Sequence, residues 1–109
     1  MGLGMKQYEV YLIALDPTLG HEINKIRPGV IISPDEMNDS LGTVIVAPLT
    51  SRSKPYPTRV STRIQGRDGW IALDQIRTLD KRRLIKPLDS LGEEAVRAVK
   101  RVLKEMLVD

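Results

Sequence analysis

The sequence predicts a mainly β protein that ends in one α-helix. Through residue 88, apolar and polar residues interleave in short stretches separated by Gly and Pro, a pattern typical of strands. After residue 90 the apolar period becomes that of an amphipathic helix. A chain of 109 residues organises one core, so we expect a single domain over residues 1–109. Five or six short strands and one helix favour a small, strongly bent sheet or barrel.

Five segments rich in β-branched residues are the predicted strands: 8–15, 29–33, 43–49, 58–64 and 70–76. The connection between the first two is long for so small a domain, which makes it a candidate functional loop. Residues 34–36 open a short predicted helix, and Asp80 is expected to cap one helical turn through Arg83.

The last predicted element is a helix over residues 91–107. Ser90 and Glu93 have the spacing of a capping box, in which each side chain caps the other residue's backbone N–H. Apolar residues recur at helical spacing on one face, and the other face carries charges of both signs. This pattern predicts a helix packed on the sheet.

Charge is distributed unevenly along the chain. Residues 52–86 hold ten basic and three acidic residues, a net charge of +7, while the rest holds seven basic and eleven acidic residues, a net charge of −4. Seven of the ten are Arg, whose donors match phosphate oxygens better than those of Lys. The segment predicts a face that binds a polyanion such as nucleic acid, with an ordinary solvated surface as the alternative.

Composition excludes several kinds of chemistry. Without cysteine there is no disulfide, thiolate metal site or cysteine nucleophile, and the single histidine, His21, excludes a paired-histidine mechanism. The acidic residues Asp16, Glu22, Asp74 and Asp80 have no spacing typical of a calcium or zinc site, so we expect no metal. Neither a signal peptide nor a membrane span is evident, and we expect a cytoplasmic protein that binds no membrane.

Five motifs in order resemble the MazF/PemK/Kid family of toxin endoribonucleases, including the ChpBK-like toxins. They are YEVYLIALDPTLGHE from residue 8, RPGVIIS at 27–33, Asn38, APLTS at 47–51 and DQIRTLDKRRL at 74–84. The resemblance covers nearly the whole chain. It implies an SH3-like small barrel of the CcdB/Kid/MazF kind, a homodimer, and a cognate antitoxin whose flexible acidic tail covers the RNA groove.

The resemblance also implies the activity: sequence-specific cleavage of single-stranded mRNA without metal or other cofactor, inhibiting translation and growth. The ribose 2′-OH would attack its own 3′-phosphodiester and leave 2′,3′-cyclic phosphate and 5′-OH ends. Such a reaction must remove the 2′ proton, neutralise a dianionic phosphorane and protonate the leaving 5′ oxygen.

Arg27 is the first candidate catalytic residue, because Pro28 restricts its backbone to extended conformations. In the family the matching Arg is catalytic; the alternative is a surface Arg paired with Glu22 or Asp74. Thr50, at a predicted strand end, matches the family's threonine that holds a non-bridging phosphate oxygen.

His21 and Asp74 match residues that some members use in cleavage, together with an Arg two residues before the Asp. Here that position is Ala72, so a cleavage mechanism that uses this Asp and Arg together would lack its acid. We therefore rank Arg27 and Thr50 above Asp74, which sits on a predicted strand and can instead hold Arg27 or Arg77 in place. His21 is equally consistent with a structural role.

RNA recognition is assigned to polar and basic residues of the +7 segment and its edge. Tyr56 is the aromatic residue placed to stack on a base, whereas Trp70 is expected to fill the core. The predicted RNA-binding residues are Ser51, Arg52, Lys54, Tyr56, Arg67, Gln75 and Arg77.

Two other functions stay open. A CcdB-like toxin that binds DNA gyrase shares the barrel, but the chain lacks the Trp-Gly-Ile ending of those toxins. The second alternative is a toxin remnant that binds RNA or antitoxin but does not cut RNA, and the Ala at position 72 supports this alternative.

Overall fold

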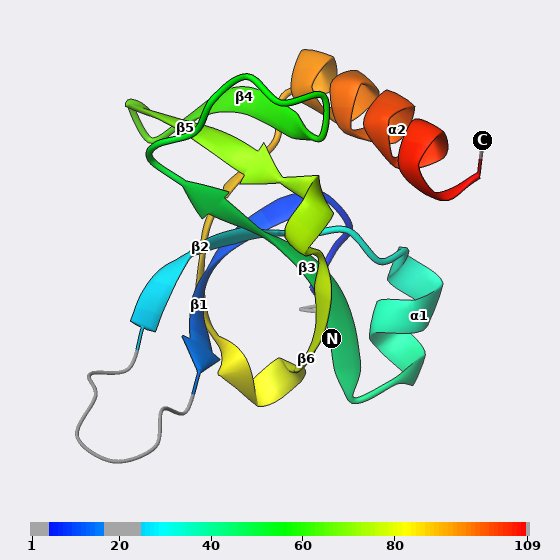
Figure 1. Cartoon of the computed structure of the whole chain (residues 1–109). Coiled ribbons are helices and arrows are strands. Elements are labelled where there is room, and N and C mark those ends of the chain that lie inside the picture. Colours follow the sequence, from blue (N-terminus) through cyan, green and yellow to red (C-terminus); the bar gives the residue numbers. More distant parts are fainter. Residues whose placement is uncertain (1–4, 17–24, 109) are drawn as a thin grey trace.

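The computed structural model describes residues 5–16 and 25–108 as a bent antiparallel sheet with a helix at its end (Figure 1). The predicted mainly β class is confirmed. The elements in chain order are β1 (Glu9–Asp16), β2 (Lys25–Ile31), α1 (Asp35–Ser40), β3 (Thr43–Thr50), β4 (Arg59–Ile64), β5 (Arg67–Ala72), a 3₁₀ turn η1 (Leu73–Gln75), β6 (Arg77–Asp80), a 3₁₀ turn η2 (Lys81–Arg83), β7 (Leu84–Ser90) and α2 (Glu93–Leu107).

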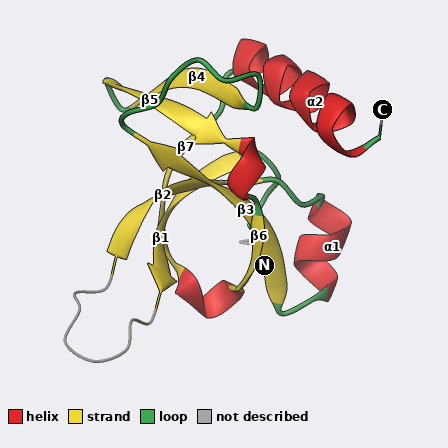
Figure 2. Ribbon diagram, in the orientation of Figure 1, coloured by secondary structure: helices red, strands yellow, loops and turns green. Residues whose placement is uncertain are grey.

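Strand β3 organises the sheet, since it pairs with three neighbours. The strand order is β4-β5-β3-β2-β1-β7, and β6 pairs with the first half of β3. Because β3 pairs with β6 over residues 43–46, with β2 over 46–48 and with β5 over 49–50, its neighbours change along its length and the sheet curls. Figure 2 shows β1, β2, β3 and β6 bending around one space while the β4–β5 hairpin and α2 lie beyond it.

Two apolar clusters fill the two sides of this curled sheet. One lies between the sheet and α2 and includes Val10, Leu73 and Val99, all fully buried. The other lies inside the curl and includes Ile13 and Val46. The amphipathic period of α2 is thus explained by packing, because its apolar face covers the first cluster.

The strand predictions hold for β1, β3 and β4 within one residue. Strand β2 begins at Lys25, four residues before its predicted start, so Arg27 lies within a strand rather than at a loop end. The strand predicted over 70–76 is wrong in its second half: β5 occupies 67–72, and a 3₁₀ turn follows. Strands β6 and β7 were not predicted.

The predicted capping box at Ser90 is wrong. Ser90 ends β7 and pairs with Glu9 of β1, so its backbone belongs to the sheet. The helix cap is Gly92, whose carbonyl accepts from the N–H of Val96 at 3.0 Å. The turn predicted at Asp80 is confirmed, since its carboxylate accepts from the N–H of Arg82 at 2.8 Å.

The amide of Asn38 ties α1 to the sheet from a buried position. It is 1% exposed, and its Nδ2 donates to the carbonyls of Met5 and Ser33, both at 3.0 Å. Its Oδ1 accepts from the Ser33 hydroxyl, which in turn accepts from the N–H of Ile45. Asn38, one of the five motifs of the family resemblance, therefore has a structural role.

Candidate functional site

Arg27 and Thr50 lie two residues beyond the paired ends of β2 and β3. The ladder between these strands pairs Val30 with Ala47 and Gly29 with Pro48. Continued in the same register for two more residues, it sets Arg27 opposite Thr50, and neighbouring strands lie about 5 Å apart. Residues that oppose each other in an antiparallel register share a face of the sheet. Both side chains are half-buried.

Gly29 permits the close packing beneath this pair. A β-carbon there would overlap the Cδ1 atom of Ile13 and lie 3.3 Å from the carbonyl oxygen of Ala47. Ile13 is fully buried and is also the β1 partner of Arg27. The Arg-Pro-Gly motif thus sets an Arg in an extended strand two residues from a position where a β-carbon would displace the Ile13 side chain.

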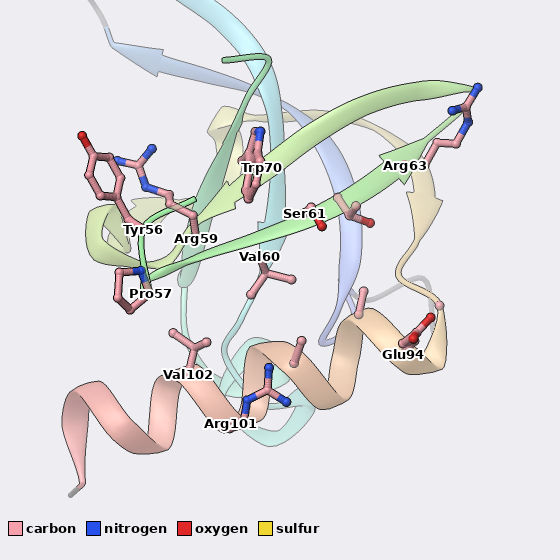
Figure 3. A pocket seen from close by; sticks show the side chains of 14 residues that line it. Tyr56, Pro57, Arg59, Val60, Ser61, Arg63, Trp70, Glu94, Arg101 and Val102 are labelled. Atoms are coloured by element: carbon pink, nitrogen blue, oxygen red, sulfur yellow. The ribbon is translucent and has the colours of Figure 1, made fainter. Parts of the chain in front are cut away.

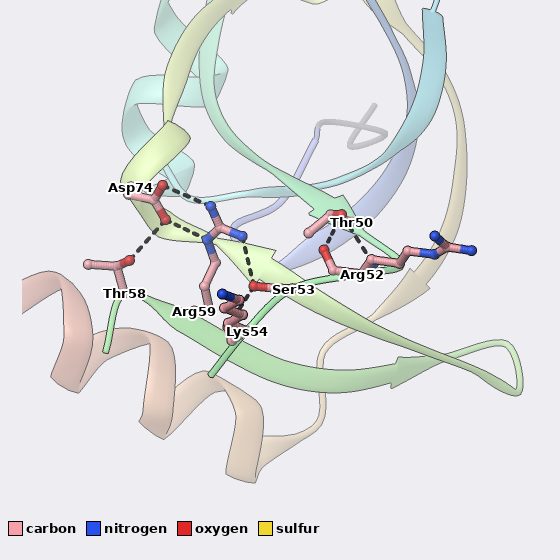
Figure 4. Close-up of polar contacts among 7 residues, drawn as sticks. All are labelled: Thr50, Arg52, Ser53, Lys54, Thr58, Arg59 and Asp74. Carbon is pink, nitrogen blue, oxygen red and sulfur yellow. Dashed lines mark hydrogen bonds and ion pairs between the residues drawn. The ribbon is translucent and has the colours of Figure 1, made fainter. Parts of the chain in front are cut away.

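The Thr50 hydroxyl closes a tight turn at the end of β3. Its Oγ1 donates to the carbonyl of Arg52 at 2.9 Å and accepts from the N–H of the same residue at 3.3 Å (Figure 4). This local turn directs the chain into residues 51–58. The hydroxyl stays at the surface, because Thr50 is half-buried and Ser51 and Arg52 are exposed.

A cleft of about 620 Å³ opens beside Thr50. Its walls are mostly apolar, and basic residues from two strands line it. Three of its residues, Thr50, Ser51 and Arg67, belong to the predicted site, and Lys86 on β7 adds a cation that the sequence reasoning did not single out. The lining residues are Leu12, Pro28, Leu49, Thr50, Ser51, Ile64, Gln65, Arg67, Asp68, Gly69, Lys86 and Leu88.

Asp74 lies in a second polar cluster, centred on Arg59 (Figure 4). The guanidinium of Arg59 donates through Nε to Asp74 Oδ1 at 2.7 Å and through Nη2 to Oδ2 at 3.1 Å. Its third donor, Nη1, reaches the Ser53 hydroxyl at 2.9 Å, and the Thr58 hydroxyl donates to Asp74 Oδ1 at 2.9 Å. The ring of Tyr56 lies against the guanidinium, with the Cζ atom of Arg59 5.4 Å from the centroid of the ring.

These contacts decide the ionisation of Asp74. Hydrogen bonding from Arg59 first, and from Thr58, lowers the pKa of the Asp74 carboxyl from 3.8 to about 2. The same bond raises the pKa of Arg59. At neutral pH Asp74 is therefore ionised, with both oxygens engaged, and has no proton to donate.

The predicted partners of Asp74 are wrong. Its carboxylate binds Arg59 rather than Arg27 or Arg77, and it lies on the turn η1 rather than on a strand. Register explains the new partner: Arg59 on β4 pairs directly with Ala72 on β5. Ala72, where the resemblance implies an Arg, is 1% exposed. The guanidinium that binds Asp74 here belongs instead to Arg59, the residue opposite Ala72 in the ladder.

The other predicted RNA-binding residues are spread more widely. Lys54 is exposed in the 51–58 segment, Gln75 is exposed on η1, and Arg77 is exposed on β6 opposite Val46. Because Val46 precedes Thr50 by four strand residues, Arg77 lies about 13 Å back along β3. His21 and Glu22 lie outside the described residues.

Trp70 does not fill the core as predicted. It is half-buried on β5 and lines a groove of about 660 Å³ between the β4–β5 hairpin and α2. In this groove Val60 of β4 and Val102 of α2 point toward each other, and Arg101 and Glu94 stand along the helix (Figure 3). The groove also contains Tyr56, which is 49% exposed, so it adjoins the Arg59 cluster.

Sequence reasoning counted Arg59 only as one of ten basic residues and missed its central place. The available clue was alternation: in the predicted strand Arg59 and Ser61 share one face while Val60 faces the core. In residues 5–16 and 25–108, no three His, Asp or Glu side chains gather as a metal site would require. Over the same residues, no helix has the length and apolarity needed to cross a bilayer.

Comparison with known proteins shows the family of this chain. Residues 6–107 match the family described as PemK-like, MazF-like toxin of type II toxin–antitoxin system. The endoribonuclease MazF of Staphylococcus saprophyticus is 41% identical over 101 residues, which cover 87% of this chain and 84% of that protein.

Solved structures show the same fold. MazF of Deinococcus radiodurans superposes with a TM-score of 0.80 at 28% identity, covering 95% of this chain and 96% of the other. A MazE–MazF complex from the same organism gives a TM-score of 0.83 at 28% identity, covering 94% and 95%. The expected small barrel with a terminal helix is confirmed.

Proposed function

Because this chain belongs to the family of PemK-like and MazF-like toxins of type II toxin–antitoxin systems, we propose that it is a sequence-specific endoribonuclease. Its substrate would be single-stranded mRNA, cut without a metal ion by a single domain. Two observations support the proposal: Thr50 lines a cleft that Arg67 and Lys86 also line, and the β2–β3 register, continued for two residues beyond the paired ladder, would bring Arg27 opposite Thr50.

The proposed reaction is an internal transesterification. The 2′-OH of a ribose gives its proton to a base and its oxygen forms a bond to the adjacent phosphorus. The bond from phosphorus to the 5′ oxygen breaks, and the leaving oxygen takes a proton. The products are a 2′,3′-cyclic phosphate and a 5′-OH end. Negative charge accumulates on the two non-bridging oxygens in the transition state, and stabilising that charge is the main task of the site.

Arg27 and Thr50 divide that task. The planar guanidinium of Arg27 offers parallel N–H donors to two oxygens of the phosphorane. The Thr50 hydroxyl turns from the Arg52 carbonyl to donate to one non-bridging oxygen, a small change because only a hydroxyl rotation is needed. His21 remains the proposed proton-transfer residue. Asp74 is not proposed as the acid, since its pKa of about 2 and its bonds to Arg59 keep it ionised.

The RNA strand is proposed to follow the surface from the cleft to the 51–58 segment. Arg52 and Lys54 would contact phosphates, while Arg67 and Ser51 act at the cleft beside Thr50. Exposed bases of single-stranded RNA stack on aromatic rings, which suits the half-exposed Tyr56. Gln75 and Arg77, which follow Asp74 in the chain, would contact a more distant nucleotide.

Two macromolecular partners belong to the proposal. A second copy of the chain would complete a homodimer, since a barrel of this size has a limited core of its own. A cognate antitoxin with a flexible acidic tail would cover the basic surface, as a similar chain is found with MazE. We expect the protein to act on mRNA in the cytoplasm and so to arrest translation and growth.

The test is cleavage of total mRNA by the purified protein in excess EDTA. Labelling of the new 5′ ends by polynucleotide kinase without phosphatase treatment would report 5′-OH groups, and sequencing them would give the cleavage site. Arg27→Ala should slow cleavage by about 10²–10³-fold, the usual cost of losing one charge-stabilising donor. Asp80→Asn, which breaks a surface Arg–Asp pair far from the cleft, is the control.

Intact RNA after incubation with the folded wild-type protein would contradict the proposal. So would an undiminished rate in Arg27→Ala, or trapping of gyrase on DNA by the pure protein. Each of these results is read at the same protein concentration, since a dimer's stability depends on it.

A further inference from the structure

We infer that Arg59 and Asp74 are positioning residues, which hold residues 53–58 in one shape and through that segment set how tightly RNA binds. The inference rests on the proposed endoribonuclease function and deepens it. It assigns a task to the two residues that the catalytic proposal leaves aside.

The contacts of Arg59 define the task. One guanidinium uses Nε and Nη2 on Asp74 and Nη1 on Ser53, so it joins the turn η1 to the start of the segment (Figure 4). Thr58, at the segment's end, donates to the same carboxylate. The segment is therefore fixed at both ends to one ion pair, and the Tyr56 ring between them stacks on the guanidinium.

Burial separates this pair from the other ion pairs of the sheet. The Arg59 side chain is 12% exposed and that of Asp74 is 36% exposed. In the Asp80–Arg82 pair the Arg is 89% exposed, although its guanidinium also forks onto both carboxylate oxygens, at 3.0 and 3.1 Å. A partly buried forked pair resists solvent competition better than an exposed one.

The backbone of the segment has little else to hold it. Its described backbone bonds are local or reach its immediate neighbours: Tyr56 N–H to the Lys54 carbonyl, Arg59 N–H to the Tyr56 carbonyl and Leu73 N–H to the Thr58 carbonyl. Because no strand pairing covers residues 51–58, the side-chain cluster supplies most of their order. Loss of the cluster would free the segment that carries Lys54 and Tyr56.

Native-state proteolysis tests the clamp without RNA. Trypsin can cut after the exposed Arg52, whereas Pro55 protects the bond after Lys54. Asp74→Asn should speed cleavage at Arg52 about tenfold, the change expected when one charge-assisted hydrogen bond is lost at a partly exposed site. Asp80→Asn, the matched control with the same substitution in an exposed forked pair, should leave the rate unchanged.

A second variant guards against general loss of stability in Asp74→Asn. Ser53→Ala removes the third Arg59 bond and the bond from the Ser53 hydroxyl to the Lys54 carbonyl, and it leaves the ion pair in place, so unfolding in urea should change little. Trypsin should still cut at Arg52 at least about threefold faster, as the loss of these two ordinary hydrogen bonds implies. Equal proteolysis rates in wild type, Asp74→Asn and Ser53→Ala would overturn the inference.

Kinetics on an RNA oligonucleotide that spans the mapped cleavage site test the consequence. Asp74→Asn should raise KM about tenfold with kcat within about twofold, the pattern of lost binding rather than lost chemistry. A fall in kcat at unchanged KM, with loss of one limb of the pH–rate profile, would make Asp74 catalytic and overturn the inference. Wild-type protein that cuts no RNA would contradict the proposed function alone, and the trypsin rates would still decide whether the pair holds the segment.

Discussion

Substitution of Gly29 by Ala should disturb the site through the packing beneath it. The added β-carbon overlaps the Cδ1 atom of the fully buried Ile13 and lies 3.3 Å from the Ala47 carbonyl. Forcing a methyl group into a close-packed core costs about 1–3 kcal/mol. The strain falls on β1 and β2 two residues from Arg27, and a misplacement of about 1 Å at a catalytic group can slow a reaction about 10²-fold.

Ile13→Val removes the overlapped atom and provides the internal check. Alone it should cost about 0.5–1.5 kcal/mol as an ordinary core truncation. Combined with Gly29→Ala it should cost less than the sum of the two, by about 1 kcal/mol, because the methyl group of one fills the space left by the other. RNA cleavage should recover in the double variant for the same reason.

Urea unfolding at one fixed protein concentration measures these costs, with midpoints compared at a common slope. Gly42→Ala is the control, since a β-carbon at Gly42 meets nothing within 4 Å; its effect should stay within about 0.5 kcal/mol. Strictly additive costs for Gly29→Ala and Ile13→Val would refute the packing argument. A silent Gly29→Ala would do so as well.

Three further predictions follow from other contacts. The folded-state pKa of Asp74 is lowered to about 2, so the stability that its pair with Arg59 contributes is complete above about pH 4 and is lost as the pH falls toward 2. In acid titrations followed by circular dichroism, Asp74→Asn should therefore lose less stability than wild type over that interval. Parallel titration curves for the two proteins would count against the contribution of the pair. Asn38→Ala removes the donor to the buried Ser33 carbonyl and the part-buried Met5 carbonyl, and the acceptor of the Ser33 hydroxyl, so unfolding should become easier by about 2–4 kcal/mol. A cost below about 1 kcal/mol in urea unfolding would show that the amide is not the tie between α1 and the sheet. Arg67→Gln should weaken the salt dependence of RNA binding: the slope of the log binding constant against the log salt concentration should fall in magnitude by about 0.7, the value for one phosphate contact on a single strand. An unchanged slope would show that Arg67 does not contact the RNA.

The sequence supported the parts of the fold that periodicity determines. Strands β1, β3 and β4 alternate or are continuously apolar, and the α2 face repeats at helical spacing, so each could be placed from the sequence. Strand β7 could not. Its central residues, Ile85, Lys86 and Pro87, are exposed and do not alternate between apolar and polar. The strand tolerates this composition because it is an edge strand, paired only with β1 among the described strands.

The ends of elements were hidden for a related reason. Ser90 and Glu93 have ideal capping spacing, yet pairing of Ser90 with Glu9 draws it into the sheet. Likewise Leu73 continues the apolar run of β5 but turns into η1, where it fills the core with 0% exposure. Local spacing cannot decide between a sheet and a cap when both satisfy the same backbone groups.

The candidate site was predicted in part. The resemblance supplied Arg27 and Thr50, and their places relative to each other depend on the register of β2 on β3, whose paired residues end two positions short of them. The partner of Asp74 could not be found from local sequence, because Arg59 lies 15 residues away and reaches it across the β4–β5 ladder. Pairs that depend on tertiary register are the contacts that a single sequence hides.

A double-mutant cycle on Arg27 and Thr50 tests the central claim most directly. Single-turnover cleavage of the mapped RNA site would be measured in EDTA for wild type, Arg27→Ala, Thr50→Val and the double variant. If both groups hold one phosphate, each single variant loses about 10²-fold or more, and the double is scarcely slower than the worse single, because groups that act as a unit are not additive. Losses that multiply in full, or a rate in either single variant equal to that of wild type, would contradict the claim.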